Sequence, residues 1–189
     1  QAGLPVRFVA DHRPYRERKV RILNGGHTVL TPAALLSGHT LVRTCMADRG
    51  LRNFLDGALF QEIIPTLSLP RAECEDFALA VEERFDNPYV DHRLVDIALN
   101  SVSKWRARVL PSVEAFHRRQ GALPLRLCRT AAGRLRGCRT LRAGRILLVA
   151  EQLIKVLKVI RHGSVSLSTW NSFLPPTRRR NPHAPRGIR

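Results

Sequence analysis

The sequence predicts a mainly α, multi-helical domain followed by a basic tail that we expect to be disordered. Pro, Asp and Gly residues divide residues 14–124 into successive helical segments, and no alternating strand pattern occurs there. Residues 1–125 carry 17 Lys and Arg against 14 Asp and Glu, whereas residues 126–189 carry 15 against the single acid Glu151. The net charge of +17 therefore belongs mainly to the tail.

The first half of the domain reads as a series of helices with recognisable starts and ends. Pro14 is typical of a helix start. Gly38 and Thr40 then separate a short helix from the next one. Asp48 can cap a further helix, which we expect to run to about Ile64.

The second half continues in the same way and then changes character. Apolar residues at helical spacing predict a helix from Pro70 to Phe85. The turn at residues 86–88 is expected to start another helix, on which Leu94, Ile97, Ala98 and Ser101 share one stripe. Residues 129–139 show neither helical nor strand periodicity.

We divide the chain into three parts on this basis. Residues 1–13 are a linker, residues 14–127 form the helical domain, and residues 128–189 are a divergent, partly disordered basic tail. The tail has three possible origins: an arm that binds nucleic acid, a solvated tail without a role, or the product of an altered reading frame. Only Trp170 and Phe173 could stack on bases, which disfavours nucleic-acid binding.

Composition also limits the compartment and the class of protein. The four cysteines form no CxxC pair and no cluster with histidine, so they predict reduced thiols in a cytoplasmic protein without a structural zinc site. The longest apolar run, residues 146–160, is interrupted by Glu151, Lys155 and Lys158. We therefore expect no membrane span.

Residues 18–28 carry the candidate chemistry. Read as a helix at about 100° per residue, they place Lys19, Asn24 and His27 on one side, together with apolar Val20 and Leu23. A lysine among apolar neighbours loses solvation, which lowers its pKa and suits it to general acid–base work. An alternative is that residues 24–26 simply end a helix and the lysine extends into water.

The pattern Lys-x4-Asn-x2-His within residues 18–28 resembles the signature of the polyol-specific, metal-independent long-chain dehydrogenases. This family includes mannitol dehydrogenases, fructuronate reductases and tagaturonate reductases. Three further blocks, residues 62–70, 84–92 and 97–111, resemble the family in the same order. The last of these blocks is most similar to the tagaturonate reductases.

The resemblance implies the C-terminal substrate domain of an NAD-dependent sugar-acid oxidoreductase that interconverts tagaturonate and altronate without a metal. It implies a sugar-acid or polyol substrate and an N-terminal nucleotide-binding domain that holds most of the NAD. No glycine-rich dinucleotide fingerprint occurs in this sequence, so residues 1–13 are expected to lead from a missing domain and the chain is expected to be inactive alone. The alternatives are partner or nucleic-acid binding through the tail, and an inert remnant.

The resemblance also assigns roles to individual residues. It implies that the catalytic residues are Lys19, Asn24 and His27. The residues expected to bind the substrate are His92, Lys104 and Arg108. A cation opposite a substrate carboxylate is physically sensible, although these three side chains could equally be ordinary surface groups.

Overall fold

The computed structural model describes residues 8–136 of the chain, and the side chains as far as residue 131. These residues are helical, and within them extended segments meet only in one antiparallel bridge between Leu41 and Arg93. The predicted mainly α fold is thus confirmed. None of the helices in this part of the chain is long and apolar enough to span a membrane. The expected disorder of the basic tail concerns residues that lie largely outside the described part.

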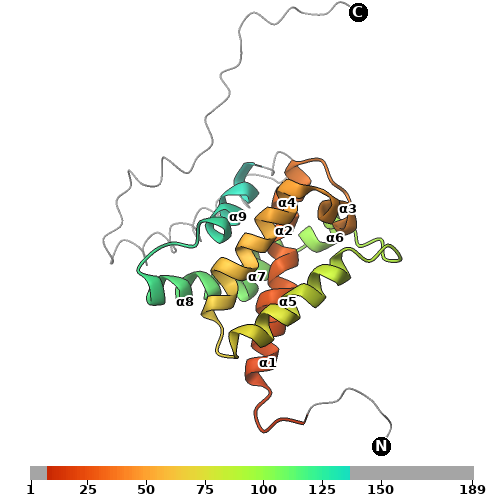
Figure 1. The fold of residues 1–189 in the computed structure, drawn as a ribbon. Coiled ribbons are helices and arrows are strands. Elements are labelled where there is room, and N and C mark those ends of the chain that lie inside the picture. The colour runs from red at the N-terminus through yellow and green to blue at the C-terminus, as the bar shows by residue number, and fades with distance from the viewer. Residues whose placement is uncertain (1–7, 137–189) are drawn as a thin grey trace, which may run out of the picture. The chain divides into compact units, whose positions relative to one another are not determined.

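The helices follow one another with short connections (Figure 1). Nine are α-helical, two are π-helical (η1 and η2) and one is a short 3-10 turn (η3) among the described residues. Their bounds are α1 Arg13–Arg18, η1 Lys19–Asn24, α2 Gly25–Leu36, α3 Val42–Ala47, α4 Arg49–Asp56, η2 Gly57–Ile63, η3 Ile64–Thr66, α5 Arg71–Phe85, α6 Leu94–Ala98, α7 Ser101–Arg108, α8 Leu110–Gln120 and α9 Leu125–Arg136.

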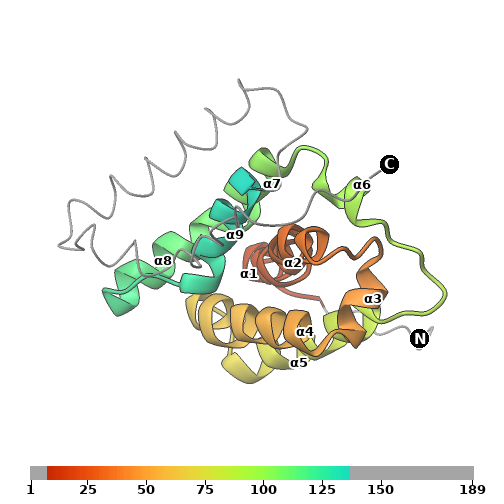
Figure 2. The same ribbon diagram turned by 90° about the horizontal axis from the view of Figure 1, so that it is seen from above.

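Helix α2 lies at the centre of this arrangement. Figure 2 views it nearly end-on, with other helices around it, and it packs against α4, α6, α7 and α9. Val29, Leu30 and Ala34 of α2 are fully buried. Because burial of apolar side chains is the main favourable term in folding, α2 is the element on which the rest of the domain assembles.

The helix predicted from Asp48 to about Ile64 is confirmed, and its capping explains where it begins. The Asp48 carboxylate accepts hydrogen bonds from the backbone N–H groups of Gly50 and Leu51, at 2.8 and 3.0 Å. Helix α4 continues directly into η2, and the fully buried Leu55, Leu59 and Ile63 recur every four residues along them. The helix expected from Pro70 to Phe85 is likewise present as α5.

The prediction that a helix starts at the turn formed by residues 86–88 is wrong, because α6 begins only at Leu94. The preceding segment is held by backbone pairing instead: the N–H of Val42 donates to the carbonyl of His92 at 3.0 Å, and the N–H of Leu94 donates to that of Thr40 at 2.9 Å. This pairing between distant segments leaves no sign in the local sequence.

The predicted stripe over residues 94–101 is correct only in part. Leu94 and Ile97 are buried as expected. Asn100, however, has a φ of 54°, in the left-handed region that a helix interior does not adopt. The helix therefore ends at Ala98, and Ser101 begins α7.

The expectation that residues 129–139 lack helical structure is wrong as far as Arg136, because α9 runs from Leu125 to Arg136. Leu127, Cys128 and Ala131 of α9 are buried, and α9 packs against α2 and η2. The apolar stripe of this segment is short and lies among many arginines, so its helical spacing is not evident in the sequence. The boundary proposed between residues 127 and 128 lies inside this helix.

Glu62 fixes the start of α9. Its carboxylate accepts hydrogen bonds from the backbone N–H groups of Arg126 and Leu127, at 3.0 and 2.9 Å. These donors at a helix N-terminus have no partner within the helix. Burial raises the pKa of Glu62, while its bonds to Arg126 and Leu127 oppose the shift. Gly57 has no side chain, which leaves room for the Arg126 guanidinium that passes over it.

We predict that Glu62→Ala lowers the free energy of unfolding by about 1–3 kcal/mol, because it leaves buried N–H groups of α9 unpaired. Gln61→Ala is the matched control, since Gln61 is exposed and also bonds to Arg126; we expect it to cost about 0.5 kcal/mol or less. Urea unfolding measures both values. Equal losses in the two variants would show that Glu62 does not hold α9.

Candidate active site

Residues 18–28 form a continuous helix that contains a π-helical turn. Helix α1 passes into η1 and then into α2 without a break. The backbone N–H of Gly25 bonds to the carbonyls of Ile22 and Val20, and the second bond has the five-residue spacing of a π-helix. The alternative that residues 24–26 end a helix is therefore wrong.

The π turn changes the angular relation that the sequence suggested for Lys19. Because hydrogen bonds in a π-helix span five residues, each residue of η1 turns through less than the 100° of an α-helix, and Asn24 lies closer in angle to Lys19 than the sequence reading placed it. The side chain of Lys19 is nevertheless exposed, and Lys19 is not among the residues that line the pocket described below. The expected apolar surroundings of Lys19 are thus not found, and its exposure agrees with the alternative in which the lysine extends into water.

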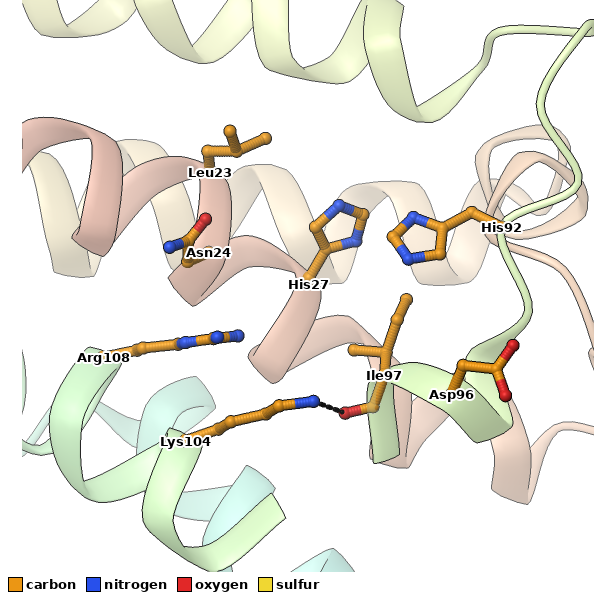
Figure 3. A pocket seen from close by; sticks show the side chains of 8 residues that line it. All are labelled: Leu23, Asn24, His27, His92, Asp96, Ile97, Lys104 and Arg108. Atoms are coloured by element: carbon orange, nitrogen blue, oxygen red, sulfur yellow. Dashed lines mark hydrogen bonds between the residues drawn. The ribbon is translucent and has the colours of Figure 1, made fainter. Parts of the chain in front are cut away.

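A pocket of about 350 Å³ opens beside the start of α2 (Figure 3). It brings together five of the six residues singled out in the sequence, from η1, α2, the segment before α6, and α7. The lining residues are Leu23, Asn24, His27, His92, Asp96, Ile97, Lys104 and Arg108.

Helix α7 supplies the two cations, Lys104 and Arg108, which are four residues apart and therefore share a face. The ammonium group of Lys104 donates to the carbonyl of Ile97 at 3.0 Å, near the end of α6 (Figure 3). The Arg108 guanidinium donates a long bond of 3.4 Å to the Thr28 hydroxyl. Lys104 thus has a structural bond and also borders the pocket.

Gly25 allows α7 to come close. A Cβ atom at this position would lie 3.4 Å from the backbone carbonyl oxygen of Arg108. The neighbouring Gly26 lies against the ring of Phe85, whose atoms would be 3.5 Å from an added Cβ.

His27 is held between two rings. Its imidazole stacks on Phe85, with ring centroids 4.0 Å apart and planes at 27°, and meets the edge of His92 at 4.7 Å. Burial, with smaller contributions from His92 and Arg108, lowers the pKa of His27 to about 3. Its Nδ1 atom is buried without a hydrogen-bond partner among the described residues. His27 is therefore a neutral ring, suited to hydrogen bonding and not to carrying charge.

Asp96 and Ile97 line the pocket but were not singled out in the sequence. Asp96 falls between two of the family-like blocks, so no motif drew attention to it. Its spacing gave no signal either, because His92, four residues earlier, lies before α6, whereas Asp96 lies in the first turn of that helix. Asp96 is the one carboxylate among the lining residues, opposite the cations of α7.

The described residues fit a sugar better than a dinucleotide. Pockets of this size hold small molecules, and the lining offers amide, imidazole, carboxylate and cationic groups for hydroxyls and a carboxylate. Residues 8–136 contain no strand followed by a glycine-rich turn, the element that binds a dinucleotide pyrophosphate. Nor do they contain a group of three or more metal-ligating side chains.

Comparisons with known proteins agree on one family. The profile of the mannitol dehydrogenase C-terminal domain matches residues 11–166, and so continues past Leu127. An altronate oxidoreductase of Klebsiella pneumoniae strain 342 is 51% identical over 124 residues, which are 66% of this chain and 26% of that protein. An altronate oxidoreductase of Escherichia coli O139:H28 is 49% identical over 124 residues, which are again 66% of this chain and 26% of that protein. The chain thus spans about a quarter of the length of these relatives.

Two solved structures resemble the fold. A D-sorbitol dehydrogenase in its substrate-free form has a TM-score of 0.65 and 26% identity, over 69% of this chain and 27% of that one. A mannitol 2-dehydrogenase of Pseudomonas fluorescens, in a ternary complex with NAD and D-mannitol, has a TM-score of 0.67 and 19% identity, over 89% of this chain and 37% of that one. The second likeness concerns the fold alone.

We predict that His27 stays neutral on acidification until the pH approaches about 3. Because the unfolded chain would protonate this residue near 6.5, the native state loses stability as the pH falls from about 6.5 toward 3. NMR titration of the imidazole protons checks this, with His27→Gln to assign the resonance. A His27 midpoint near 6.5 would mean that the ring is not buried against Phe85 in solution.

Proposed function

We propose, because the chain belongs to the family of mannitol dehydrogenase C-terminal domains, that it is the substrate-binding part of an NAD-dependent sugar-acid oxidoreductase that interconverts tagaturonate and altronate. The observation that carries this proposal is the pocket, which combines Asn24 and His27 of the signature helix with two cations on α7. The altronate oxidoreductases at about half identity support the choice of substrate class.

The charges of the pocket support a substrate with a carboxylate. Lys104 and Arg108 would bind the carboxylate of the sugar acid, Arg108 with the paired donors of its guanidinium. His92 and Asp96 would bond to hydroxyls farther along the chain of the sugar. A neutral polyol would bring no negative charge to the two cations, which outnumber Asp96, the one carboxylate of the lining, so the pocket favours the acid.

In this proposal the helix that carries the signature pattern, within residues 18–28, contacts the substrate oxygen at which the reaction occurs. Asn24 and His27 would donate hydrogen bonds to this oxygen and stabilise the negative charge that develops on it. Lys19, which lies on η1 outside the lining of the pocket, would reach that oxygen to give it a proton during reduction and remove one during oxidation. A neutral His27 suits this role, because a cation there would compete with Lys19 as the proton donor.

A nicotinamide cofactor would supply or accept the hydride, and NAD is the cofactor that the family relationship supports. In our proposal a nucleotide-binding domain outside these 189 residues holds it. Positioning of reactants provides roughly 7–11 kcal/mol of barrier reduction. We therefore expect the chain alone not to oxidise NADH with tagaturonate.

The test is to join the chain to the nucleotide-binding domain of an altronate oxidoreductase and measure NADH oxidation with tagaturonate. We expect activity that Lys19→Ala lowers by about 10²–10⁴-fold in kcat, the usual contribution of a general acid or base. Arg16→Ala is the matched control, since Arg16 is an exposed cation on α1 one turn before the signature. It should leave kcat unchanged.

Two results would contradict the proposal. Equal activity of the Lys19→Ala and Arg16→Ala proteins would remove Lys19 from the chemistry. A well-folded fusion without any activity on tagaturonate or fructuronate would favour the alternative that the chain is an inert remnant.

A further inference from the structure

A second group of ionisable side chains lies outside the pocket, between α4 and α5, which run side by side in both views (Figures 1 and 2). Glu82 of α5 is only 5% exposed. One of its carboxylate oxygens, Oε2, accepts from the guanidinium of Arg52 on α4 at 3.3 Å. Asp56 lies one turn after Arg52 on the same helix, and its carboxyl group raises the pKa of Glu82.

The other oxygens of this group lack a donor. Oε1 of Glu82 and Oδ1 of Asp56 are buried, and neither has a hydrogen-bond partner among the described residues. The two carboxyl groups act on each other both as charges and as hydrogen-bonding groups. When both are ionised they repel each other, and buried acceptors without donors are costly. A single proton removes both problems, because a protonated carboxyl donates to the carboxylate beside it.

We propose that Asp56 and Glu82 hold one proton between them and that this proton fastens α5 to α4. The proposal accounts for both unpaired oxygens with one hydrogen atom. It is independent of the proposed function.

The electrostatics of Glu82 agree with a shared proton. Burial, then the charge of Asp56 and its hydrogen bond, raise the pKa of Glu82 to about 6, and Arg52 opposes the rise. Both of these charged groups belong to α4. The other elements packed against α5, namely η1, α3, η2 and η3, contribute no charged group that acts on Glu82 within the described residues.

The pair is connected to the pocket through α5. Phe85 lies three residues after Glu82, about one helical turn, and its ring stacks on His27 and lies against Gly26. A change in the seating of α5 would therefore move the ring that holds His27. Glu82 thus acts as a positioning residue, which touches no substrate itself.

The sign of the pH dependence follows from linkage. The folded state binds the proton more tightly than the unfolded state, where a glutamate titrates near 4.5. Below about pH 4.5 the pair makes its full contribution to the free energy of unfolding, and this contribution is lost as the pH rises through about 6. Over this window the equilibrium constant for folding should fall by about 30-fold from this pair.

The direct test is a side-chain carboxyl ¹³C NMR titration of the chain. We expect Glu82 to titrate near pH 6 and to shift downward in Asp56→Asn, because the amide of asparagine can donate to Glu82 without a shared proton. In parallel, urea unfolding from pH 4 to 7 should show that the wild type loses stability relative to Glu82→Gln as the pH rises, and that Glu83→Gln, at an exposed neighbour on α5, does the same. The comparison between variants cancels the opposite contribution of His27, which all three proteins share.

The link to the pocket has its own readout, the ring-current shift of the His27 imidazole on Phe85. In a protein that carries His92→Gln, this shift should change near pH 6. The His92→Gln change removes the imidazole that lies beside His27. When Glu82→Gln is added, the shift should stay constant over the same range. If Glu82 titrates together with Glu83, or if Asp56→Asn leaves its midpoint unchanged, the two carboxyl groups do not share a proton. Since the titration uses the wild type and Asp56→Asn, poor folding of Glu82→Gln would not prevent this decision.

Discussion

The close approach of two backbones, at Gly25 in the signature helix and Arg108 at the end of α7, determines the geometry of the pocket. A Cβ added to Gly25 would lie 3.4 Å from the carbonyl oxygen of Arg108, so the two backbones are separated by little more than the space of one methyl group. This contact brings the cations of α7 beside Asn24 and His27, although Lys104 lies eighty residues after Asn24 in the sequence. Helix α2 itself packs against four other α-helices, namely α4, α6, α7 and α9.

The charges around the pocket are divided between two kinds of group. Lys104 and Arg108 are the basic side chains of the lining, and the first is oriented by a carbonyl of α6. His27 is kept neutral by burial against Phe85. In the proposed reaction this division separates tasks: fixed cations bind the substrate carboxylate, and uncharged donors meet the oxygen whose charge changes. In our proposal the Asp56–Glu82 pair also positions His27, because it holds α5, and Phe85 of α5 stacks on the His27 ring.

Much of the fold could be predicted from the sequence because local signals determined it. Asp48 caps α4, Pro70 precedes α5, and apolar spacing identifies the core faces. The errors arose where distant contacts override local signals. The pairing of His92 with Val42 delays α6, and burial against α2 stabilises α9 despite its arginines. At the site, the motif pointed to Asn24 and His27, but no periodicity reveals the π turn at η1 or the place of Asp96 in the pocket.

The central claim is that this pocket selects a sugar acid, and the most direct measurement is an amide NMR titration of the chain with altronate and with the neutral polyol D-mannitol. Altronate should shift the resonances of the lining residues, and D-mannitol at the same concentration should shift them much less; these residues are Asn24, His27, His92, Lys104 and Arg108. Equal shifts with both compounds would contradict selection by the cations of α7. Shifts by altronate confined to other residues would contradict the assignment of the pocket itself.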